Sequence, residues 1–501
     1  MKNSILYQEH CTPVFEQRQL LLPLDVSILV DLNDPVRWVN AFVDSLTDAE
    51  VRPTQSSLRG RKQTHPERML LKICLMGSVL ARDSLRQIED LCRNDLRFLW
   101  LLEGLPAPDH TTLWRFKERF SQQMPELMRY MTRWLHQKGF ITSDHVFIDG
   151  TKMEAMSNRY TFVWKKAVLK YLERLLGKLP GLLDACVEVL PTQEVRVCLE
   201  EPEETLSLLI DWVQLRMNQL GVVLVYGKGS RKHETQRLLE TLMDSLKKYR
   251  SYQQQITTCG EHRNSYSKTD HDATFMRMKD DHMRNGQLKP AYNLSIAVNS
   301  EFIVWVDVSQ DRTDYSRAPV ILDELEQIFT RPVEAVVMDA GYDSEENHFY
   351  CREKGILAYI KPQYYEAQKK KSYRNNPKNW KSMVYDPLAD TFTCLGGKTL
   401  TYRATKKQRT SQGLPVEKRI YACEECSHCS MKDKCTQAKG NRQVHWNKRL
   451  HEWREESEHL IQTEQGILYR VNRSVQAEGA FGTMKSNRGW NRLRHTGMEK
   501  T

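Results

Sequence analysis

The spacing of apolar residues predicts a helical region near the N-terminus. Between Pro66 and Phe120, apolar residues recur every three or four positions in the segments PERMLLKICLMGSVLA, SLRQIEDLCRNDLRFLWLL and TTLWRFKERF. This is the period of a helix that buries one face. The glycine and prolines of EGLPAPDH separate the last two segments, and Asp109 or Thr111 is suited to cap the third helix. We therefore expect three helices.

The third of these helices is rich in basic residues. Arg115, Lys117 and Arg119 stand around Trp114 and Phe116. A helix-turn-helix motif sets basic side chains against DNA in this manner. An ordinary amphipathic bundle helix with a solvated basic face has the same pattern, so the helix alone leaves both interpretations open.

Strand patterns begin at DHVFIDG and return after residue 290. The run HVFID ends on Asp149, where Gly150 is expected to supply a turn, and VEAVVMD ends on Asp339, with Gly341 two residues later. AYNLSIAVNS and EFIVWVDVSQ form a hairpin in this interpretation, joined at residues 299–301. A helix RAPVILDELEQIF and a strand ILAYIKP complete an α/β pattern, which predicts a central sheet with helices on both faces.

Between residues 160 and 261 the pattern is helical again. Leucines are spaced like heptads in VLKYLERLLGKLPGLL, TLSLLIDWVQLRMNQL and RLLETLMDSLKKYRSYQQQI. The segment interrupts the strand-rich region, so we interpret it as a helical, partly coiled-coil insertion.

Length and charge narrow the class of protein. The 501 residues exceed one ordinary core, which favours two to four structural units. The formal net charge of +10 suits a polyanionic partner. The chain has no apolar run of the ~20 residues that a membrane span needs, and its N-terminus lacks a secretory signal pattern. We expect a cytoplasmic protein without a membrane partner.

Two strand-end aspartates indicate metal-dependent phosphodiester chemistry. Mg²⁺ prefers oxygen ligands and keeps several waters, so a few carboxylates together with substrate phosphates suit it. A pair of such ions can activate an attacking oxygen and stabilise a leaving one. This chemistry requires a third acid, and Glu478 lies in the helix-forming stretch GILYRVNRSVQAEGAFGTMK with Lys485 two turns later on one face. In isolation, the pair of Glu478 and Lys485 also fits a surface ion pair.

Five of the twelve cysteines are clustered between Cys394 and Cys435. Tetrahedral Zn²⁺ binds Cys₄ or Cys₃His sets at about the spacing of this cluster, which contains His428. Reduced, unliganded thiols are the alternative. If zinc is present, it is expected in a structural role, with Cys423, Cys426, Cys429 and Cys435 as ligands. The seven scattered cysteines read as small buried apolar residues.

Basic residues interleaved with aromatic ones flank the cysteine cluster. QKKKSYRNNPKNWKS precedes it, and Arg488, Trp490, Arg492 and Arg494 follow it. Such runs are either solvated loops or surfaces that neutralise phosphates and stack unpaired bases.

Several long segments resemble the DDE transposases of bacterial insertion sequences. They include PERMLLKICLMGSVLARDSLRQIEDLCRND, FIDGTKMEAMSNRYTFVWKK, DATFMRMKDDHMRNGQLKPAYNLSIAV, VVMDAGYDSEENHFYC and NRSVQAEGAFGTMK, in that order along nearly the whole chain. The resemblance implies an α/β ribonuclease H-like mixed-sheet catalytic domain. It also implies an α-helical N-terminal domain, a helical insertion and a small Cys-rich, zinc-ribbon-like insertion.

The resemblance assigns roles to individual residues. The three catalytic and Mg²⁺-binding acids match Asp149, Asp339 and Glu478. A related Tyr-Arg-Glu-Lys signature, which contacts the transposon end, matches Tyr469, Arg473, Glu478 and Lys485, although the first two gaps are each one residue longer here. Arg488 and the basic residues of the third N-terminal helix are further DNA-binding candidates. Asp270, Asp272, Asp280 and Asp281 are expected to border the site.

The resemblance further implies the organisation and activity of the chain. The expected parts are a helical DNA-binding domain at 1–135, a catalytic core at 144–159 and 262–365, the helical insertion at 160–261, the Cys-rich insertion at 366–445 and a C-terminal catalytic helix region at 446–501. The implied activity is cleavage of transposon ends and strand transfer with Mg²⁺ or Mn²⁺, on terminal inverted repeats and target DNA at the nucleoid, with a homodimer formed on DNA. The chain ends at Thr501, whereas relatives continue through a closing helix, so a defective or domesticated DNA-binding protein is the alternative.

Overall fold

The computed structural model describes residues 26–52, 64–190, 200–227, 231–261, 263–278, 286–410 and 412–500. Cys11, Cys198, Asp280 and Asp281 lie outside these ranges. The chain divides into two compact units, Met1–Gln137 and Lys138–Thr501. Across the described ranges, no helix has both the length and the apolar character needed to cross a bilayer.

The first unit is helical throughout its described part. Its helices pack around a core that includes Ile73, Met76, Phe98, Leu113 and Phe116. They are α2 (Pro35–Ser45), α3 (Asp48–Val51), α4 (Glu67–Val79), α5 (Leu85–Asn94), α6 (Leu96–Leu102), α7 (His110–Phe120) and α8 (Met124–Gln137), with short 3₁₀ turns at Val26–Ile28 and Ser121–Gln123.

The second predicted helix is in fact two helices. Asp95 is extended, with φ −106° and ψ 128°, and its side chain accepts a hydrogen bond from the Arg97 amide at the start of α6. The apolar period continues through Asp95, so periodicity could not show the break, whereas an aspartate that caps a new helix requires it. Asp109 caps α7 as predicted, by accepting from the Thr112 amide.

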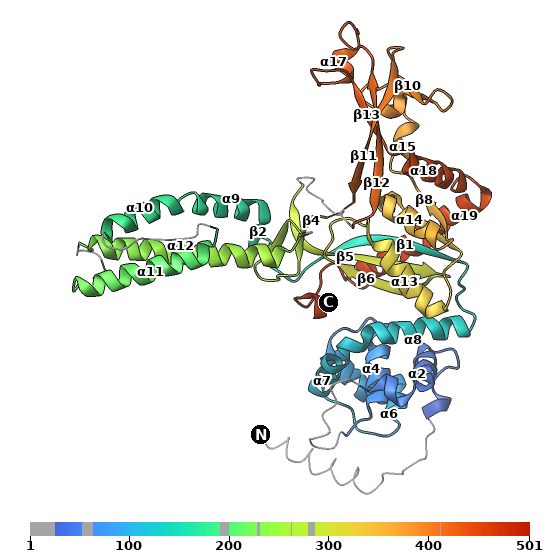
Figure 1. Cartoon of the computed structure of the whole chain (residues 1–501). Coiled ribbons are helices and arrows are strands. Elements are labelled where there is room, and N and C mark those ends of the chain that lie inside the picture. The colour runs from blue at the N-terminus through green and yellow to red at the C-terminus, as the bar shows by residue number, and fades with distance from the viewer. Residues whose placement is uncertain are drawn as a thin grey trace, which may run out of the picture. The chain divides into compact units, whose positions relative to one another are not determined.

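The second unit is organised around a six-stranded mixed sheet (Figure 1). The order β4-β5-β1-β7-β8 places β1 centrally, antiparallel to β5 and parallel to β7, and β6 pairs with β5. The strands are β1 (His145–Glu154), β4 (Thr274–Arg277), β5 (Leu288–Asn299), β6 (Phe302–Ser309), β7 (Ala335–Met338) and β8 (Leu357–Ile360). The predicted hairpin between β5 and β6 is confirmed.

Helices pack on this sheet and complete its core. α13 (Arg317–Phe329) contacts β6, and both α14 (Glu345–Glu353) and α18 (Lys448–Leu460) contact β8. The C-terminal helix consists of α19 (Glu464–Arg473), π-helical η5 (Ser474–Glu478), α20 (Gly479–Gly482) and π-helical η6 (Thr483–Asn487). Its Ala477 and Phe481 pack on Phe147 and Val337 of the sheet.

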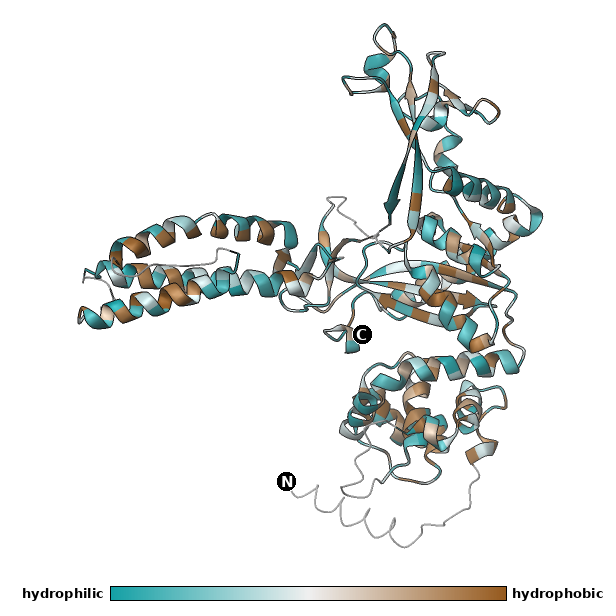
Figure 2. Ribbon diagram, in the orientation of Figure 1, coloured by the Kyte–Doolittle hydropathy of each residue, from teal (hydrophilic) through white to brown (hydrophobic). Residues whose placement is uncertain are grey.

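Four helices form an arm between β1 and β3. They are α9 (Lys165–Leu176), α10 (Leu179–Val189), α11 (Pro202–Gln219) and α12 (Glu234–Cys259). Figure 2 shows apolar residues along their facing sides, where Leu206, Leu209, Val213 and Leu242 are buried. The predicted helical character is confirmed, except that the segment begins with a short strand, β2 (Phe162–Trp164), paired with β3 (Ser265–Ser267).

A second sheet of five antiparallel strands carries the clustered cysteines. Its order is β13-β12-β11-β10-β9, and its aromatic core contains Phe392, Tyr421 and Trp446. The strands are β9 (Val384–Asp386), β10 (Thr391–Thr393), β11 (Thr399–Arg409), β12 (Pro415–Cys423) and β13 (Gln443–Trp446). Short helices α15 (Tyr365–Gln368) and α16 (Lys371–Arg374) precede them, and α17 (Lys432–Cys435) lies between β12 and β13.

Candidate active site

The register of the central sheet places Asp149 beside Asp339. In the parallel pair β1–β7, Ile148 stands opposite Met338, so the two aspartates are the next residues on neighbouring strands. Asp149 Oδ1 accepts the Gly150 amide at 2.8 Å, and Asp339 Oδ1 accepts the Gly341 amide at 2.8 Å. Each carboxylate therefore keeps a defined orientation at the point where the parallel pairing ends.

The prediction that β1 ends at Asp149 in a glycine turn is wrong. The strand continues to Glu154 because β5 pairs with it from Phe147 through Glu154, and Asp149 is 5% exposed. Gly150 serves a different purpose, since a Cβ there would lie 2.8 Å from Asp314 Oδ1 and 3.2 Å from the Tyr342 hydroxyl. The glycine leaves room for a close approach and makes no turn.

Asp314 is an acidic site residue that the sequence analysis missed. Asp314 faces Gly150, and its Oδ2 would lie 3.1 Å from a Cβ built on Gly341. Asp314 therefore lies next to the glycine that follows Asp149 and the glycine two residues after Asp339. Asn293 Nδ2 donates to Asp314 Oδ1 at 2.6 Å. A signal was available, because DRTDYSR follows β6 and opens α13, another point where a strand ends on acidic residues.

The pKa of Tyr342 reflects the negative charge of the nearby carboxylates. Its hydroxyl donates to Ser295 Oγ at 3.0 Å. Burial raises the pKa of Tyr342 well above its ordinary value, and the charge of Asp314 raises it further. The charges of Asp149 and Asp339 act in the same direction. Three carboxylates thus surround one neutral, buried phenol.

Arg473 connects the first and third predicted acids. Its Nη1 lies 2.9 Å from Asp149 Oδ2, and its Nη2 lies 3.3 Å from Glu478 Oε1. The Glu478 side chain is 56% exposed, whereas that of Asp149 is 7% exposed. The guanidinium neutralises charge between the buried acid of the strand and the exposed acid of the helix.

The π-helical turn at η5 accounts for the long gap between Arg473 and Glu478. In an α-helix, residues four apart share a face, whereas a π-helical turn contains one more residue. Arg473 and Glu478 are five apart and in contact, with the turn Ser474–Glu478 between them. The extra residue is absorbed by the wider turn, so the two side chains still meet.

The other members of the predicted Tyr-Arg-Glu-Lys set lie along the same helix. Lys485 Nζ donates to Thr151 Oγ1 at 2.7 Å, two residues beyond Asp149. Tyr469 stacks on His145 with ring centroids 4.8 Å apart and packs in the core beside Phe147. Arg488 lies over the Trp490 ring at 5.6 Å.

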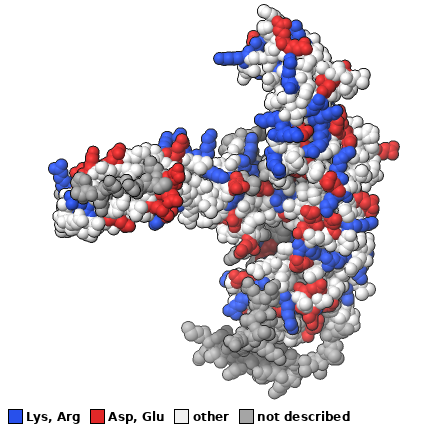
Figure 3. Space-filling view, viewed as in Figure 1, with Lys and Arg blue, Asp and Glu red and all other residues white. Residues whose placement is uncertain are grey.

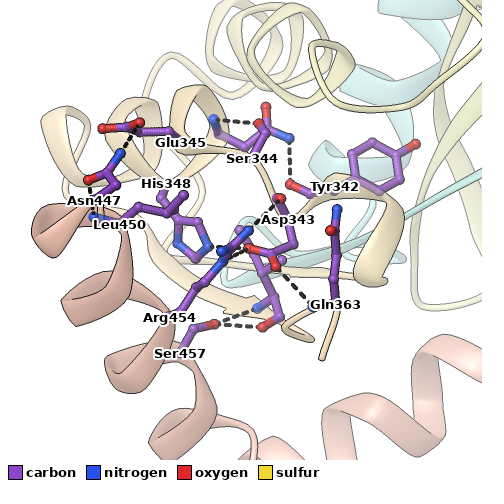
Figure 4. Close-up of polar contacts among 12 residues, drawn as sticks. Tyr342, Asp343, Ser344, Glu345, His348, Gln363, Asn447, Leu450, Arg454 and Ser457 are labelled. Carbon is purple, nitrogen blue, oxygen red and sulfur yellow. Dashed lines mark hydrogen bonds and ion pairs between the residues drawn. The ribbon is translucent and has the colours of Figure 1, made fainter. Parts of the chain in front are cut away.

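A buried polar network anchors the loop that follows Asp339 (Figure 4). Asp343 Oδ1 accepts from Arg454 Nε at 2.9 Å, Asp343 Oδ2 accepts the Gln363 amide at 2.9 Å, and His348 lies 3.2 Å away. Burial by itself would raise the pKa of Asp343, but the His348 hydrogen bond and the Arg454 charge outweigh it and lower the pKa. The loop is thereby fixed to α18.

Glu345 makes a second attachment of the same kind. Asn447 Nδ2 and Arg449 Nη2 donate to its two oxygens at 2.6 and 2.7 Å. Asp343 and Glu345 therefore attach the start of α14 to α18 and to Asn447, the residue before α18. The sequence did not predict these contacts.

The predicted basic helix of the first unit is α7. Arg115 and Lys117 are exposed beside Trp114, which is 52% exposed, while Leu113 and Phe116 are buried. Arg119 is partly covered and lies 3.6 Å from Glu67. The amphipathic helix is as predicted, and its contact with DNA stays a prediction.

The five clustered cysteines lie around one end of the five-stranded sheet. They line one cavity together with Gly396 and Arg442. Burial raises the pKa of the Cys435 thiol, Arg442 lowers it, and the neighbouring thiols raise it further. Elsewhere, Cys92, Cys186, Cys259 and Cys351 are buried and Cys74 is partly buried, in line with the expectation for scattered cysteines.

The β11–β12 hairpin carries a basic surface that the sequence analysis did not identify. Its exposed or half-buried cations are Arg403, Lys406, Lys407, Arg409, Lys418 and Arg419. Figure 3 shows Lys and Arg side chains gathered where this hairpin lies. Neighbouring residues of a strand point to opposite faces, so the exposure of both Lys406 and Lys407 shows that this part of β11 is open to solvent on both faces.

The donor chemistry of the acid cluster suits a hard divalent cation, because carboxylate oxygens are the ligands that Mg²⁺ prefers. Among the residues that the structure describes, no three His, Cys, Asp or Glu side chains already stand together so as to hold a metal ion. Between Asp149 and Glu478, the positive charge is supplied by Arg473.

Two comparisons with protein families define the class of the chain. Residues 393–501 match the family model described as a transposase DDE domain, and residues 24–119 match one described as a transposase domain. The chain therefore carries two regions that match transposase families. More particularly, the resemblance to the DDE transposases of insertion sequences is confirmed. No curated protein and no solved structure matches the chain.

Proposed function

We propose that this chain cleaves DNA at the ends of an insertion sequence and transfers the freed 3′-hydroxyl to a target phosphodiester. The observation that supports it most is the placement of three acids. Asp149 and Asp339 directly follow the paired residues Ile148 of β1 and Met338 of β7, and Arg473 joins Glu478 to Asp149. The strand order around β1 agrees with the ribonuclease H-like core that the resemblance implies.

Asp149, Asp339 and Glu478 would hold Mg²⁺ or Mn²⁺, which activates the attacking oxygen and stabilises the leaving one in such chemistry. Asp314 is proposed as a fourth acid that orients the metal-binding carboxylates, because it faces the glycines that follow Asp149 and Asp339. Arg473 would leave the carboxylates when the cation binds and offer its guanidinium to a phosphate. Lys485, which donates to Thr151, is proposed to contact the phosphate backbone of the same DNA.

The remaining predicted residues are proposed to contact other parts of the DNA. Arg115, Lys117 and Arg119 of α7 are proposed to bind the terminal inverted repeat, and Tyr469 to support the helix that carries Arg473. The basic β11–β12 hairpin is a further candidate for phosphate contacts. Because two ends must be joined, we expect a homodimer to assemble on DNA at the nucleoid.

Alanine substitution of Asp149, Asp339 or Glu478 tests the proposal. Each variant is expected to lose metal-dependent nicking and strand transfer by about 10³-fold or more, since the acids act as a unit. Binding to a labelled duplex carrying the terminal repeat should persist. Asp244→Asn on α12 is the matched control, because its exposed carboxylate pairs only locally with Lys248, and it should retain activity.

The decisive substrates are a supercoiled plasmid and labelled transposon ends. Nicking by the Asp339→Ala protein would contradict the assignment. A wild-type protein that shifts DNA but never nicks it would instead indicate the defective or domesticated DNA-binding protein. Nicking without joining would indicate a nuclease.

A further inference from the structure

The thiols at the end of the five-stranded sheet surround a space for one small atom. Cys394, Cys423, Cys426, Cys429 and Cys435 line a cavity of about 20 Å³. A cavity needs only about 10–15 Å³ to hold one water molecule. The space is therefore of the right order for a single ion, and tetrahedral coordination would use four of the five sulfurs.

Cys423 belongs to the core of the sheet. Side chains alternate between faces along a strand, so Cys423 shares the face of Tyr421, and both are buried in the aromatic cluster. It stands opposite Leu400 in the β11–β12 pair. Its Sγ donates to the Glu425 carbonyl at 3.6 Å. Cys426 is buried in the same cluster, so it is the position of Cys423 within β12, paired with Leu400, rather than its burial, that marks it as a core residue.

Cys394 reaches the other cysteines from the β10–β11 hairpin. It occupies the turn between β10 and β11, where its amide donates to the Lys398 carbonyl at 2.9 Å. A Cβ built on Gly396 would lie 3.4 Å from Cys429 Sγ and 3.7 Å from Cys394 Sγ. The two sulfurs thus flank the same glycine, although their residues are 35 positions apart in the chain.

The other two thiols are positioned by backbone contacts. The Arg442 amide donates to Cys426 Sγ at 3.4 Å, and the Cys426 amide donates to Asn441 Oδ1 at 3.1 Å. Cys435 is the last residue of the short helix α17, and its amide donates to the Met431 carbonyl at 2.9 Å.

We propose that Cys394, Cys426, Cys429 and Cys435 bind one structural Zn²⁺, and that Cys423 is a core residue. This set replaces Cys423 of the sequence-based set with Cys394. Each thiol releases its proton to solvent as its sulfur binds the ion. In the described ranges no three such side chains yet stand at ligand spacing, so binding requires side-chain rotation toward the cavity.

The wild-type protein provides the first test. Full-length chain purified without chelator should contain about one zinc per chain by elemental analysis. Alkylation before and after treatment with a chelator, read by peptide mass spectrometry, should show chelator-dependent labelling at Cys394, Cys426, Cys429 and Cys435. Cys394 that labels equally in both states, or protein that carries no zinc and takes up no Co²⁺, would overturn the proposal.

Two matched variants separate the two ligand sets. Cys423→Ala should keep the zinc and the intense sulfur-to-cobalt absorption of the Co²⁺-loaded protein. Cys394→Ala should lose at least tenfold in metal affinity and show weakened absorption, with circular dichroism reporting whether each variant folds. Retention of full affinity by Cys394→Ala together with its loss by Cys423→Ala would select the sequence-based set and refute ours. Because the readout is metal content, it is independent of DNA cleavage.

Discussion

The central sheet and the C-terminal helix hold their acids in different ways. Asp149 and Asp339 are fixed by strand register, by amides of the residues that follow them and by burial of the first acid. Glu478 is exposed and depends on a π-helical turn and on one ion pair with Arg473. The comparison indicates that the sheet around Asp149 and Asp339 tolerates little local change, whereas the Glu478 side chain on the helix can change its conformation.

The space around the glycines differs between the two regions in the same way. On the sheet side, Gly150 is crowded by Asp314 and Tyr342. On the helix, Gly479 and Gly482 have nothing within 4 Å of a built Cβ, but Gly466, the third residue of α19, has the Leu460 carbonyl oxygen at 2.0 Å. The helix is therefore tightly packed at its start and open around Glu478.

The largest effect is expected for Gly466→Ala. A methyl group at this position meets the backbone of Leu460 and Ile461, which cannot move as a side-chain tip can. We expect a loss of about 3 kcal/mol or more in the free energy of unfolding, measured by chemical denaturation. Cleavage should fall as well, because displacing the start of α19 moves Arg473 and Glu478.

Gly479→Ala is the matched helical control. Its added methyl enters open space, and alanine favours a helix over glycine, so stability should rise by about 0.5–1 kcal/mol. If Gly479→Ala were as destabilising as Gly466→Ala, the contrast between the two ends of the helix would be wrong.

Gly150→Ala tests the crowding on the sheet side. The new Cβ would lie 2.8 Å from Asp314 Oδ1, a side-chain atom held by Asn293, so we expect a smaller loss of about 1–2 kcal/mol. Adding Asp314→Ala should relieve part of that loss, which a double-mutant cycle measures as coupling. Strictly additive effects would contradict the close approach.

Much of the α/β pattern was predictable because it depends on local signals. Strand alternation and apolar runs located β5 to β8, and the helical period located α13 and the C-terminal helix. The positions of Asp149 and Asp339, one residue beyond the paired Ile148 and Met338, depended on register between strands far apart in the chain, which the strand pattern only suggested. The true extent of β1 was missed, because a glycine usually marks a turn and here marks a close contact.

The unpredicted parts of the site are contacts between distant segments. Asp314 reaches the acid cluster through the fold of the β6–α13 loop, and the Asp343–Arg454 bond joins residues 111 positions apart. Neither produces a periodic signal. The π-helical turn was visible only as a spacing one residue too long, and its meaning required the Arg473–Glu478 contact.

The last effect depends on pH and concerns Lys381, which lies near the Asp343 anchor of the loop that follows Asp339. Its Nζ is 2.6 Å from the centroid of the Tyr364 ring. Burial, followed by the charge of Arg454, lowers the pKa of Lys381 from 10.5 to about 7. Between these values the unfolded chain binds a proton that the folded chain lacks, so wild-type stability should rise with pH over that range.

Lys381→Met removes this titration. We expect a gain of about 1 kcal/mol in the free energy of unfolding below pH 7, a modest figure because the cation lies over the Tyr364 ring, which offsets part of its burial cost. The difference from wild type should shrink as the pH approaches 10.5, the ordinary value for lysine. Denaturation curves at several pH values measure it. A constant difference across that range would mean that Lys381 keeps its proton in the folded state, and that the anchor on the sheet side accommodates a buried charge.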